Sequence, residues 1–507
     1  MADQAGRRRR PPPRSVQRPA ERARRTDPAR LAAYTVMRAV AEGAYANLEL
    51  PKELRDKGID GRDAGFTTEL VYGATRMHGF YDKVIASAAA RDVASIDDNV
   101  LDTLRLGAHQ VLGMRVATHA AVDETVALAR QVNGVGASGF VNAVMRRISE
   151  RGRDEWLAVV APEGMDAFAG AAIRTSHPEW IVRAMRAALI GHGAATAQTV
   201  GTELDALLAS DNAPAKVTLV ARPGLATVEE LLGDGVEPAL LARTAAVLDQ
   251  GDPGAFRAVR EGRAAVQDEG SQLVALALGA AAVGDKGEVA APGGVAEAGV
   301  GGGGQAERWL DLCAGPGGKA GILAGLALES GASLVANEVS THRTELIRRT
   351  LAPAVAKGAR GQVVVRTGDG REIGQDEPGA YDRVLIDVPC TGLGALRRRP
   401  EARWRRSQSD VAGLATLQRD LLASGIDATR SGGVIGYATC SPHLAETRFV
   451  VSDVMKKRDD VDLVDARGLF VDVEGRQIPG LGEGPFVQLW PHRHGTDGMF
   501  FALLRKR

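Results

Sequence analysis

Hydrophobic residues recur at helical spacing through the first third of the chain. Between residues 30 and 153, apolar side chains return every three or four positions, as at Leu70 and Ala74 and again at Leu101 and Leu104. This period places them on one face of a helix. Clusters rich in Gly and Asp interrupt the pattern, and runs typical of strands are scarce. The pattern predicts an all-helical domain over residues 30–153.

The pattern becomes mixed over residues 154–262. Ser176 and Pro178 stand at the start of an amphipathic stretch, so we expect Ser176 to cap a helix that has Pro178 in its first turn. Residues 217–220 (VTLV) have the β-branched, apolar composition of a strand. We predict a small α+β connector here.

From residue 263 to residue 507, short apolar runs alternate with longer stretches rich in Ala, Leu and Arg. Such runs are typical of buried strands, and the stretches between them have room for the helices that join parallel strands. We therefore predict a doubly wound, Rossmann-like α/β domain with its chemistry at the carboxyl ends of the strands. The expected strands lie at 309–312, 333–336, 363–365, 383–386 and 433–437, followed by an antiparallel pair at 486–490 and 499–504.

Composition narrows the class of protein. The 507 residues are enough for about three domains, and 63 basic residues balance 63 acidic ones. No apolar run approaches the roughly 20 residues of a membrane span, and the Arg-rich N-terminus lacks the apolar segment of a secretory signal. The three cysteines form no CxxC pair and the histidines show no ligand spacing, so we expect neither disulfides nor a metal. These features indicate a cytoplasmic protein of several domains.

Two segments have compositions that do not favour a packed core. Residues 1–30 contain ten Arg and three acidic residues, so this tail carries +7 and the remainder −7. We expect residues 1–29 to be disordered and to serve either as a polyanion-binding arm or as a solubilising tail. Residues 284–306 contain nine glycines, which predicts a flexible surface loop inserted into the C-terminal domain.

A glycine-rich turn follows the first predicted strand of that domain. Residues 310–319 read LDLCAGPGGK, and a turn of this kind, opening a helix, brings the backbone close to a nucleotide-like ligand. A phosphate-binding P-loop is excluded, because Cys313 occupies its first Gly position and Ala320 its hydroxyl position. Glu338 ends the next strand, where a carboxylate holds ribose hydroxyls. The spacing leaves a dinucleotide and S-adenosylmethionine both open.

Two of the three cysteines come directly after neighbouring strands. Cys390 follows the fourth predicted strand, and Cys440 follows the fifth. A lone cysteine is typically a small core residue, and we assign Cys313 to packing, but two thiols at adjacent strand ends predict a chemical role. Ser441 and Pro442 resemble a helix N-cap and first helical residue, so we expect a helix dipole to favour the Cys440 thiolate.

Three segments of the helical region resemble the NusB transcription antitermination factors. They are residues 73–76 (GATR), 104–110 (LRLGAHQ) and 140–147 (FVNAVMRR). The resemblance implies that the helical domain binds RNA.

The strand-end segments resemble a second family. Residues 310–319, 387–392 (DVPCTG) and 437–442 (YATCSP) are similar to RNA 5-methylcytosine methyltransferases, specifically the bacterial 16S ribosomal RNA small subunit methyltransferase B (Fmu/Sun) type. That type carries a NusB-like domain ahead of its catalytic domain, and the resemblance extends from about residue 30 apart from the glycine-rich insert. It implies that residues 263–507 form a class I S-adenosylmethionine-dependent methyltransferase domain. Further matching segments are 266–272, 368–371, 397–404, 417–418 and 497–501.

The resemblance implies four catalytic residues. Cytosine C5 is a poor nucleophile until a group adds at C6, and a thiolate both attacks and leaves readily. Cys440 would be that nucleophile, and Cys390 would assist product release. Asp387 would hydrogen-bond the target cytosine, and Lys319 would orient Asp387 and the base.

The resemblance also implies binding residues. The backbone of the glycine-rich turn would approach the methionine moiety, Glu338 would hold the ribose and Asp369 the adenine. Members of the family usually carry Asp at position 338 and Ala at position 388, where this chain has Glu338 and Val388. The expected cofactor residues are Cys313, Ala314, Gly315, Pro316, Gly317, Gly318, Lys319, Glu338, Asp369 and Asp387, and the expected RNA contacts are Arg397, Arg398, Arg399 and Arg403.

The motifs and the resemblance together predict an S-adenosylmethionine-dependent RNA cytosine C5-methyltransferase, a monomer that needs no metal or membrane, and the resemblance implies 16S rRNA as its substrate. The target base must be unpaired or flipped to reach the thiolate. The alternatives are the same chemistry on tRNA or another RNA, and a non-catalytic RNA-binding assembly or antitermination factor, which would need neither thiol. DNA methylation is disfavoured, because DNA cytosine methyltransferases lack the second Thr-Cys motif and the NusB-like domain points to RNA.

Overall fold

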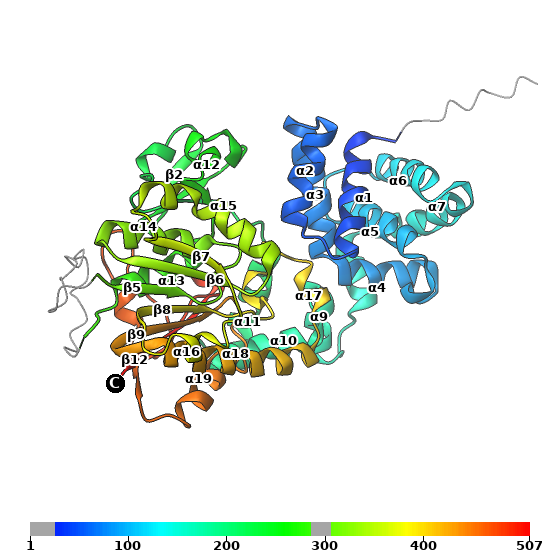
Figure 1. Cartoon of the computed structure of the whole chain (residues 1–507). Helices are drawn as coiled ribbons and strands as arrows, with labels where there is room; N and C mark the ends of the chain where they lie inside the picture. The colour runs from blue at the N-terminus through cyan, green and yellow to red at the C-terminus, as the bar shows by residue number, and fades with distance from the viewer. Residues whose placement is uncertain (1–25, 285–305) are drawn as a thin grey trace, which may run out of the picture. The chain divides into compact units, whose positions relative to one another are not determined.

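A computed structural model describes residues 26–284 and 306–507 of the chain. The described residues form two compact units, which Figure 1 colours from blue to red along the sequence. The predictions for the Arg-rich tail and for the interior of the glycine-rich insert lie outside the described residues. The smaller unit holds the described part of Met1–Ala44 with Leu48–Ala74 and Val84–Trp156, and the larger unit holds Tyr45–Asn47, Thr75–Lys83 and Leu157–Arg507.

The N-terminal helices pack closely because glycines stand where two helices meet. The helices are α1 (Pro28–Ala41), α2 (Ala46–Lys57), α3 (Gly61–Arg76), α4 (His78–Ala89), α5 (Asp98–Leu112), α6 (Thr118–Val132) and α7 (Val135–Ser149). A Cβ on Gly107 of α5 would lie 2.6 Å from Met145 Sδ on α7 and 2.7 Å from Thr125 Cγ2 on α6. A Cβ on Gly73 of α3 would lie 2.0 Å from His109 Nε2 on α5. All three segments that resemble NusB are therefore in contact, and Gly73 and Gly107 make those contacts possible.

A mixed segment links these helices to the large sheet. It contains helices α8 (Arg153–Val160), α9 (Ala167–Thr175), α10 (Glu179–Gly191), α11 (Val200–Asp211) and α12 (Arg257–Arg260), and strands β1 (Val217–Ala221), β2 (Val236–Pro238), β3 (Ala245–Leu248) and β4 (Ala264–Val266). The four strands form an antiparallel sheet in the order β2-β3-β1-β4. The strand predicted at 217–220 is β1. The prediction that Ser176 caps a helix is wrong: Ser176 ends α9 in a left-handed conformation, and α10 begins after Pro178. Only three residues separate α9 from α10, and the chain turns at Ser176.

A second sheet forms the centre of the C-terminal region (Figure 1). Its strands are β5 (Arg308–Asp311), β6 (Ser333–Glu338), β7 (Val363–Thr367), β8 (Tyr381–Asp387), β9 (Thr429–Thr439), β10 (Val461–Val464), β11 (Val487–Gln488) and β12 (Phe500–Lys506). The order is β10-β12-β9-β8-β5-β6-β7, with β11 paired to β12. The five strands from β9 to β7 are parallel, and β10, β11 and β12 add antiparallel pairs.

Successive residues of the parallel strands point to opposite faces of the sheet, and helices cover both faces (Figure 1). Leu385 packs with α13 and α14, whereas Val384 and Ile386 pack with α18 and α19. The side chains on both faces are buried, which explains why the strand sequences are continuous apolar runs. The helices are α13 (Glu269–Ala280), α14 (Gly318–Ser330), α15 (Thr341–Lys357), α16 (Ile373–Asp376), α17 (Ala402–Arg405), α18 (Gln408–Ala428), α19 (Arg448–Met455) and α20 (Pro491–His494).

The predicted fold class is confirmed: a helical N-terminal region, a mixed segment and a doubly wound α/β sheet. All five expected parallel strands are present, and the expected antiparallel pair is β11 with β12. Strand β10 was not predicted, because its four residues (VDLV) are interrupted by Asp462 and form no distinctive run. In the part of the chain that the structure describes, no helix is both long enough and apolar enough to span a membrane.

Candidate active site

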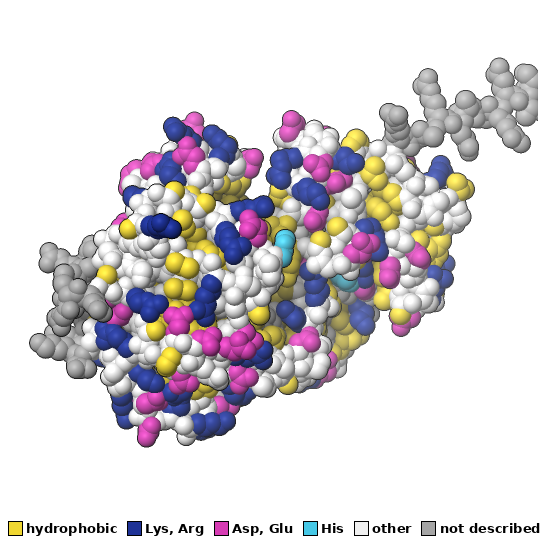
Figure 2. All heavy atoms as spheres, viewed as in Figure 1, with side chains coloured by type: hydrophobic (Ala, Val, Ile, Leu, Met, Phe, Trp, Pro, Cys, Tyr) yellow, Lys and Arg dark blue, Asp and Glu magenta, His cyan; other side chains and the backbone are white. Residues whose placement is uncertain are grey.

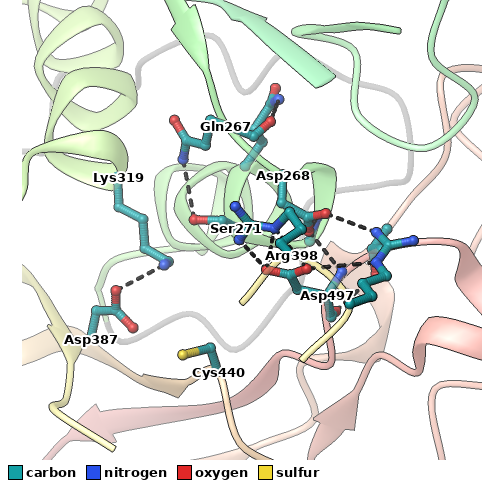
Figure 3. Close-up of polar contacts among 12 residues, drawn as sticks. Gln267, Asp268, Ser271, Lys319, Asp387, Arg398, Cys440 and Asp497 are labelled. Atoms are coloured by element: carbon teal, nitrogen blue, oxygen red, sulfur yellow. Dashed lines mark hydrogen bonds and ion pairs between the residues drawn. The ribbon is translucent and has the colours of Figure 1, made fainter. Parts of the chain in front are cut away.

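The site lies where the strand order of the large sheet reverses. Strand β5 pairs with β6 on one side and with β8 on the other, so the chain builds β5-β6-β7 outward and then returns to add β8 and β9. Ligands of open α/β sheets bind outside the carboxyl ends of the strands at such a point. The loops after β5, β8 and β9 carry the predicted Lys319, Asp387, Cys390 and Cys440 to this edge, as Figure 3 shows for three of them.

The two strand-end thiols are in contact. Cys390 Sγ and Cys440 Sγ lie 3.4 Å apart, within hydrogen-bonding distance for sulfur. The hydrogen bond from Cys390 lowers the pKa of the Cys440 thiol, and the charges of Lys319 and Arg399 act in the same direction, against burial and the charge of Asp387. The same hydrogen bond, together with burial, raises the pKa of the Cys390 thiol well above its ordinary value. Of the two thiols, Cys440 therefore has the lower pKa.

The expected helix dipole does not act on Cys440. Helix α19 begins at Arg448, and Ser441 and Pro442 lie in an irregular turn instead of at its start. The Ser441 hydroxyl donates to Glu446 Oε2 at 2.6 Å and accepts the His443 amide at 3.3 Å, within a turn and not at the start of a helix. The prediction of a helix beginning after Cys440 is wrong, and the low pKa of Cys440 has a different cause, its hydrogen bond and its charged neighbours.

Lys319 and Asp387 form a pair on the side of the site where Cys440 lies (Figure 3). Lys319 Nζ lies 2.8 Å from Asp387 Oδ2, and Lys319 is 9% exposed in the first turn of α14. Burial works against the lysine charge, but Asp387 outweighs it and raises the pKa of Lys319. The pair places a cation and a carboxylate near the Cys440 thiol.

Two acidic residues of the site were missed by sequence reasoning. Asp311, the last residue of β5, is 1% exposed, and burial followed by the charge of Asp387 raises its pKa to about 8, against the charge of Lys319. Glu446, six residues after Cys440, is fully buried and accepts hydrogen bonds from the Cys390 loop and the Cys440 loop. The signal for Asp311 was an acid directly before the glycine-rich turn. Glu446 gave no sequence signal beyond a carboxylate near Cys440.

The glycine-rich turn has the geometry of a cofactor cradle. A Cβ on Gly315 would lie 2.1 Å from Glu338 Oε2, so a glycine is needed for this carboxylate to lie against the turn. Gly317 has φ +110°, a conformation that favours glycine, and it directly precedes α14. Glu338 Oε1 accepts the Ser340 amide at 3.0 Å, and Arg343 approaches Glu338 Oε2 at 3.4 Å. These residues fit a nucleoside with a charged tail: a buried carboxylate for hydroxyls, and backbone amides for the tail.

Two other predicted cofactor residues are placed as follows. Asp369 follows β7 at the same edge and accepts hydrogen bonds from Arg371, which lower its pKa. It also lines a cavity of about 460 Å³ with Glu372, Asp420 and other residues of α16 and α18. Burial raises the pKa of the Cys313 thiol well above its ordinary value, in keeping with a packing role.

The four predicted RNA-binding arginines differ in environment. Arg403 is fully buried and donates to the carbonyls of Ser176 and Asp211 and to Asn212 Oδ1. This burial contradicts the prediction that Arg403 contacts RNA, because its guanidinium is committed to the end of α11 and the turn before α10.

Buried carboxylates hold two of the remaining arginines. Arg397 Nη2 lies 3.1 Å from Asp268 Oδ2, and Arg398 Nε lies 2.9 Å from both carboxylate oxygens of Asp497 (Figure 3). The charge of Arg399 helps to lower the pKa of the Cys440 thiol. Figure 2 shows basic and acidic side chains interspersed over the face of the larger unit in view, in keeping with the balanced net charge. Within residues 26–284 and 306–507, no cluster of His, Cys, Asp and Glu has the arrangement of a metal site.

Comparisons with known proteins identify the family of the chain. The model of the 16S rRNA methyltransferase RsmB/F family matches residues 303–505, and that of the NusB family matches residues 27–150. A protein of Mycobacterium tuberculosis (strain H37Rv) named as a methyltransferase, Rv1407, is 50% identical over 96% of this chain and 98% of its own length. Ribosomal RNA small subunit methyltransferase B of Pseudomonas putida is 31% identical over 94% of this chain and 98% of its own length. The crystal structure of PH0851 has the same fold, with a TM-score of 0.74 at 21% identity, covering 95% of this chain and 99% of that one.

The resemblance drawn from the strand-end motifs is thereby confirmed, as is S-adenosylmethionine as the cofactor. The chain belongs to the 16S rRNA methyltransferase RsmB/F family, with a NusB-family domain at its N-terminus, and is an S-adenosylmethionine-dependent RNA methyltransferase.

Proposed function

We propose that this protein methylates C5 of a cytosine in 16S rRNA through a covalent bond between Cys440 Sγ and cytosine C6. The observation that carries the proposal is the contact between Cys390 and Cys440, 3.4 Å apart, beside the Lys319–Asp387 pair. The named substrate of relatives such as the Pseudomonas putida protein supports ribosomal RNA. We further propose that the protein acts in the cytoplasm as a monomer, on naked or partly assembled RNA.

The chemistry needs one thiolate and one proton acceptor. The Cys440 thiolate adds to C6, and the electrons of the C5–C6 double bond make C5 nucleophilic. S-adenosylmethionine, when bound, supplies an electrophilic methyl group and leaves as S-adenosylhomocysteine. A base then removes the C5 proton, and the C6–S bond breaks to restore the double bond and release Cys440. Cys390, in contact with Cys440, is placed to assist this release.

Asp387 and Lys319 prepare the base for attack. A carboxyl group at the position of Asp387 would hydrogen-bond the cytosine ring and stabilise the charge that develops when the thiolate adds. Lys319 fixes Asp387 through its 2.8 Å contact and contributes positive charge that favours the thiolate. Asp387 would thus act on the cytosine ring, and Lys319 would act on Asp387 and on the Cys440 thiolate.

The cofactor residues remain those expected from the motifs. The backbone of residues 314–318 would bind the methionine moiety, Glu338 the ribose hydroxyls and Asp369 the adenine. The carboxylate of Asp369 would then bind both the adenine and Arg371, because Arg371 already donates to it.

The domain assignment is also part of the proposal. Residues 30–153 would form the NusB-like RNA-binding domain, 154–262 the connector and 263–507 the methyltransferase domain. Arg399 is retained as the candidate phosphate contact near the target base.

The test is to offer wild-type protein and S-adenosylmethionine to unmodified 16S rRNA, tRNA and a 16S rRNA in which candidate cytosines are replaced. Bisulfite sequencing would then locate 5-methylcytosine. Modification of one 16S cytosine supports the proposal, whereas modification of tRNA alone would change the substrate. RNA binding without any methylation would favour the non-catalytic assembly factor.

A further inference from the structure

A buried carboxylate lies between the two cysteine loops. Glu446, in the turn between β9 and α19, is 0% exposed. It accepts the Thr391 amide at 2.7 Å, the Thr391 hydroxyl at 2.5 Å and the Ser441 hydroxyl at 2.6 Å. Thr391 directly follows Cys390, and Ser441 directly follows Cys440. One carboxylate therefore joins the residues next to both thiols.

The surroundings of Glu446 hold it from several elements. Gln418 Nε2 on α18 lies 3.4 Å from Glu446 Oε1 and donates to the carbonyl of Pro389 at 2.9 Å. The Tyr437 hydroxyl on β9 donates to the Glu446 carbonyl at 2.6 Å. A carboxylate out of water must be well paired, and hydrogen bonds to an ionised acceptor are short and strong. Glu446 is thus fixed between α18 and the loops that follow β8 and β9.

We propose that Glu446 is a positioning residue that locks the Cys390 loop to the Cys440 loop and keeps Cys390 as the hydrogen-bond donor to Cys440. The inference rests on the proposed role of Cys440 as the nucleophile. The charge of Glu446 supports it, because it adds to the Cys440 hydrogen bond and to burial in raising the pKa of Cys390. With Cys390 held protonated, the single thiolate of the pair is on Cys440.

The other charges around the thiol pair are independent of Glu446. Lys319 on α14 and Arg399 favour the Cys440 thiolate, and Asp387 at the end of β8 opposes it. The charge of Cys440 also contributes to raising the pKa of Arg398. The hydrogen bonds that the Glu446 carboxylate accepts come from Thr391, Ser441 and Gln418 and not from these groups, so we expect a difference between the variants to report the link between the two loops.

The experiment is a pH titration of thiol reactivity in the full-length protein. Wild type, Glu446→Gln and Thr391→Val would be treated with iodoacetamide from pH 5.5 to 10, and mass spectrometry would give the alkylation rates of Cys440 and Cys390 separately. Glu474→Gln, an exposed carboxylate paired with Arg476, is the matched control. Thr391→Val keeps the shape of the side chain and removes one of the hydroxyl donors to Glu446.

The expected result is a change in selectivity between the two thiols. Each pKa unit of separation is a tenfold ratio of thiolate populations, so we expect Glu446→Gln to lower the Cys440-to-Cys390 rate ratio at pH 7 by about tenfold. Thr391→Val should lower it by about threefold, as half a pKa unit would, and Glu474→Gln should leave it unchanged.

Folded Glu446→Gln with the wild-type ratio would overturn the inference, since a purely structural role lowers thermal stability without changing selectivity. If Glu446→Gln fails to fold, an unchanged ratio in Thr391→Val overturns it instead. The ratio is measured without RNA. If the rate ratio changes in the Glu446 variant as expected but the wild-type protein methylates no cytosine, the proposed function is refuted and this inference stands.

Discussion

Asp311→Asn should make the protein more stable at neutral pH. Asp311 ends β5 with 1% exposure, and burial followed by the Asp387 charge raises its pKa to about 8. The unfolded chain has an aspartate pKa of about 3.9. A raised native pKa means that the contribution of this group is fully present below about pH 3.9 and is lost as pH rises through about 8.

The magnitude follows from the gap between the two pKa values. Each pH unit above about 3.9 costs the native state about 1.36 kcal/mol while Asp311 stays protonated. The cost is about 1.5 kcal/mol at pH 5 and about 4 kcal/mol at pH 7, as upper bounds. Asparagine keeps the shape and cannot ionise, so Asp311→Asn should recover this energy. For a domain of this size, 4 kcal/mol raises Tm by roughly 8–16 °C.

The assay is thermal and urea unfolding of the full chain from pH 5 to pH 8, followed by fluorescence of Trp309 and Trp490, which are buried in the larger unit. Asp205→Asn, an exposed position on α11, is the control. The predicted signature is a stability gain that grows with pH in Asp311→Asn alone. A gain that is equal at pH 5 and pH 8, or a loss at pH 7, would refute the reasoning.

Two further substitutions test other parts of the site. Gly315→Ala would place a Cβ 2.1 Å from Glu338 Oε2, so we expect binding of S-adenosylmethionine to weaken at least tenfold by calorimetry, with little change in Tm; unchanged affinity would show that Glu338 does not hold the ribose. Lys319→Met removes a charge that lowers the pKa of Cys440 and frees Asp387, so kcat should fall about a hundredfold and the acidic limb of the rate–pH profile should move to higher pH. A normal profile with reduced kcat would assign Lys319 to binding only.

Much of the catalytic sheet could be predicted from the sequence because its strands are buried on both faces. Runs such as residues 384–386 are apolar throughout, and an acidic residue ends each of the strands β5, β6 and β8. The switch point then brings Lys319, Asp387, Cys390 and Cys440 together, since all follow parallel strands. Local pattern was sufficient here because strand ends and function coincide.

Other features depended on contacts between distant residues. Glu446 accepts hydrogen bonds from Thr391, 55 residues earlier, and from Ser441. The second bond holds Ser441 in a turn, where it does not cap the helix that a Ser-Pro pair favours. Arg403 belongs to a run of arginines that is typical of a solvated loop, yet it is buried against Ser176 and Asp211. Neither outcome has a local sequence signal, because each depends on which segments the fold places side by side.

The most direct test of the central claim compares wild type, Cys440→Ala and Cys390→Ala with labelled S-adenosylmethionine and unmodified 16S rRNA. The account predicts that wild type labels cytosine C5 and turns over, that Cys440→Ala transfers no methyl group, and that Cys390→Ala accumulates a covalent RNA–protein adduct stable to denaturing gel electrophoresis. Full methylation by Cys440→Ala, or an adduct that forms through Cys390 in its place, would contradict the assignment of Cys440 as the nucleophile.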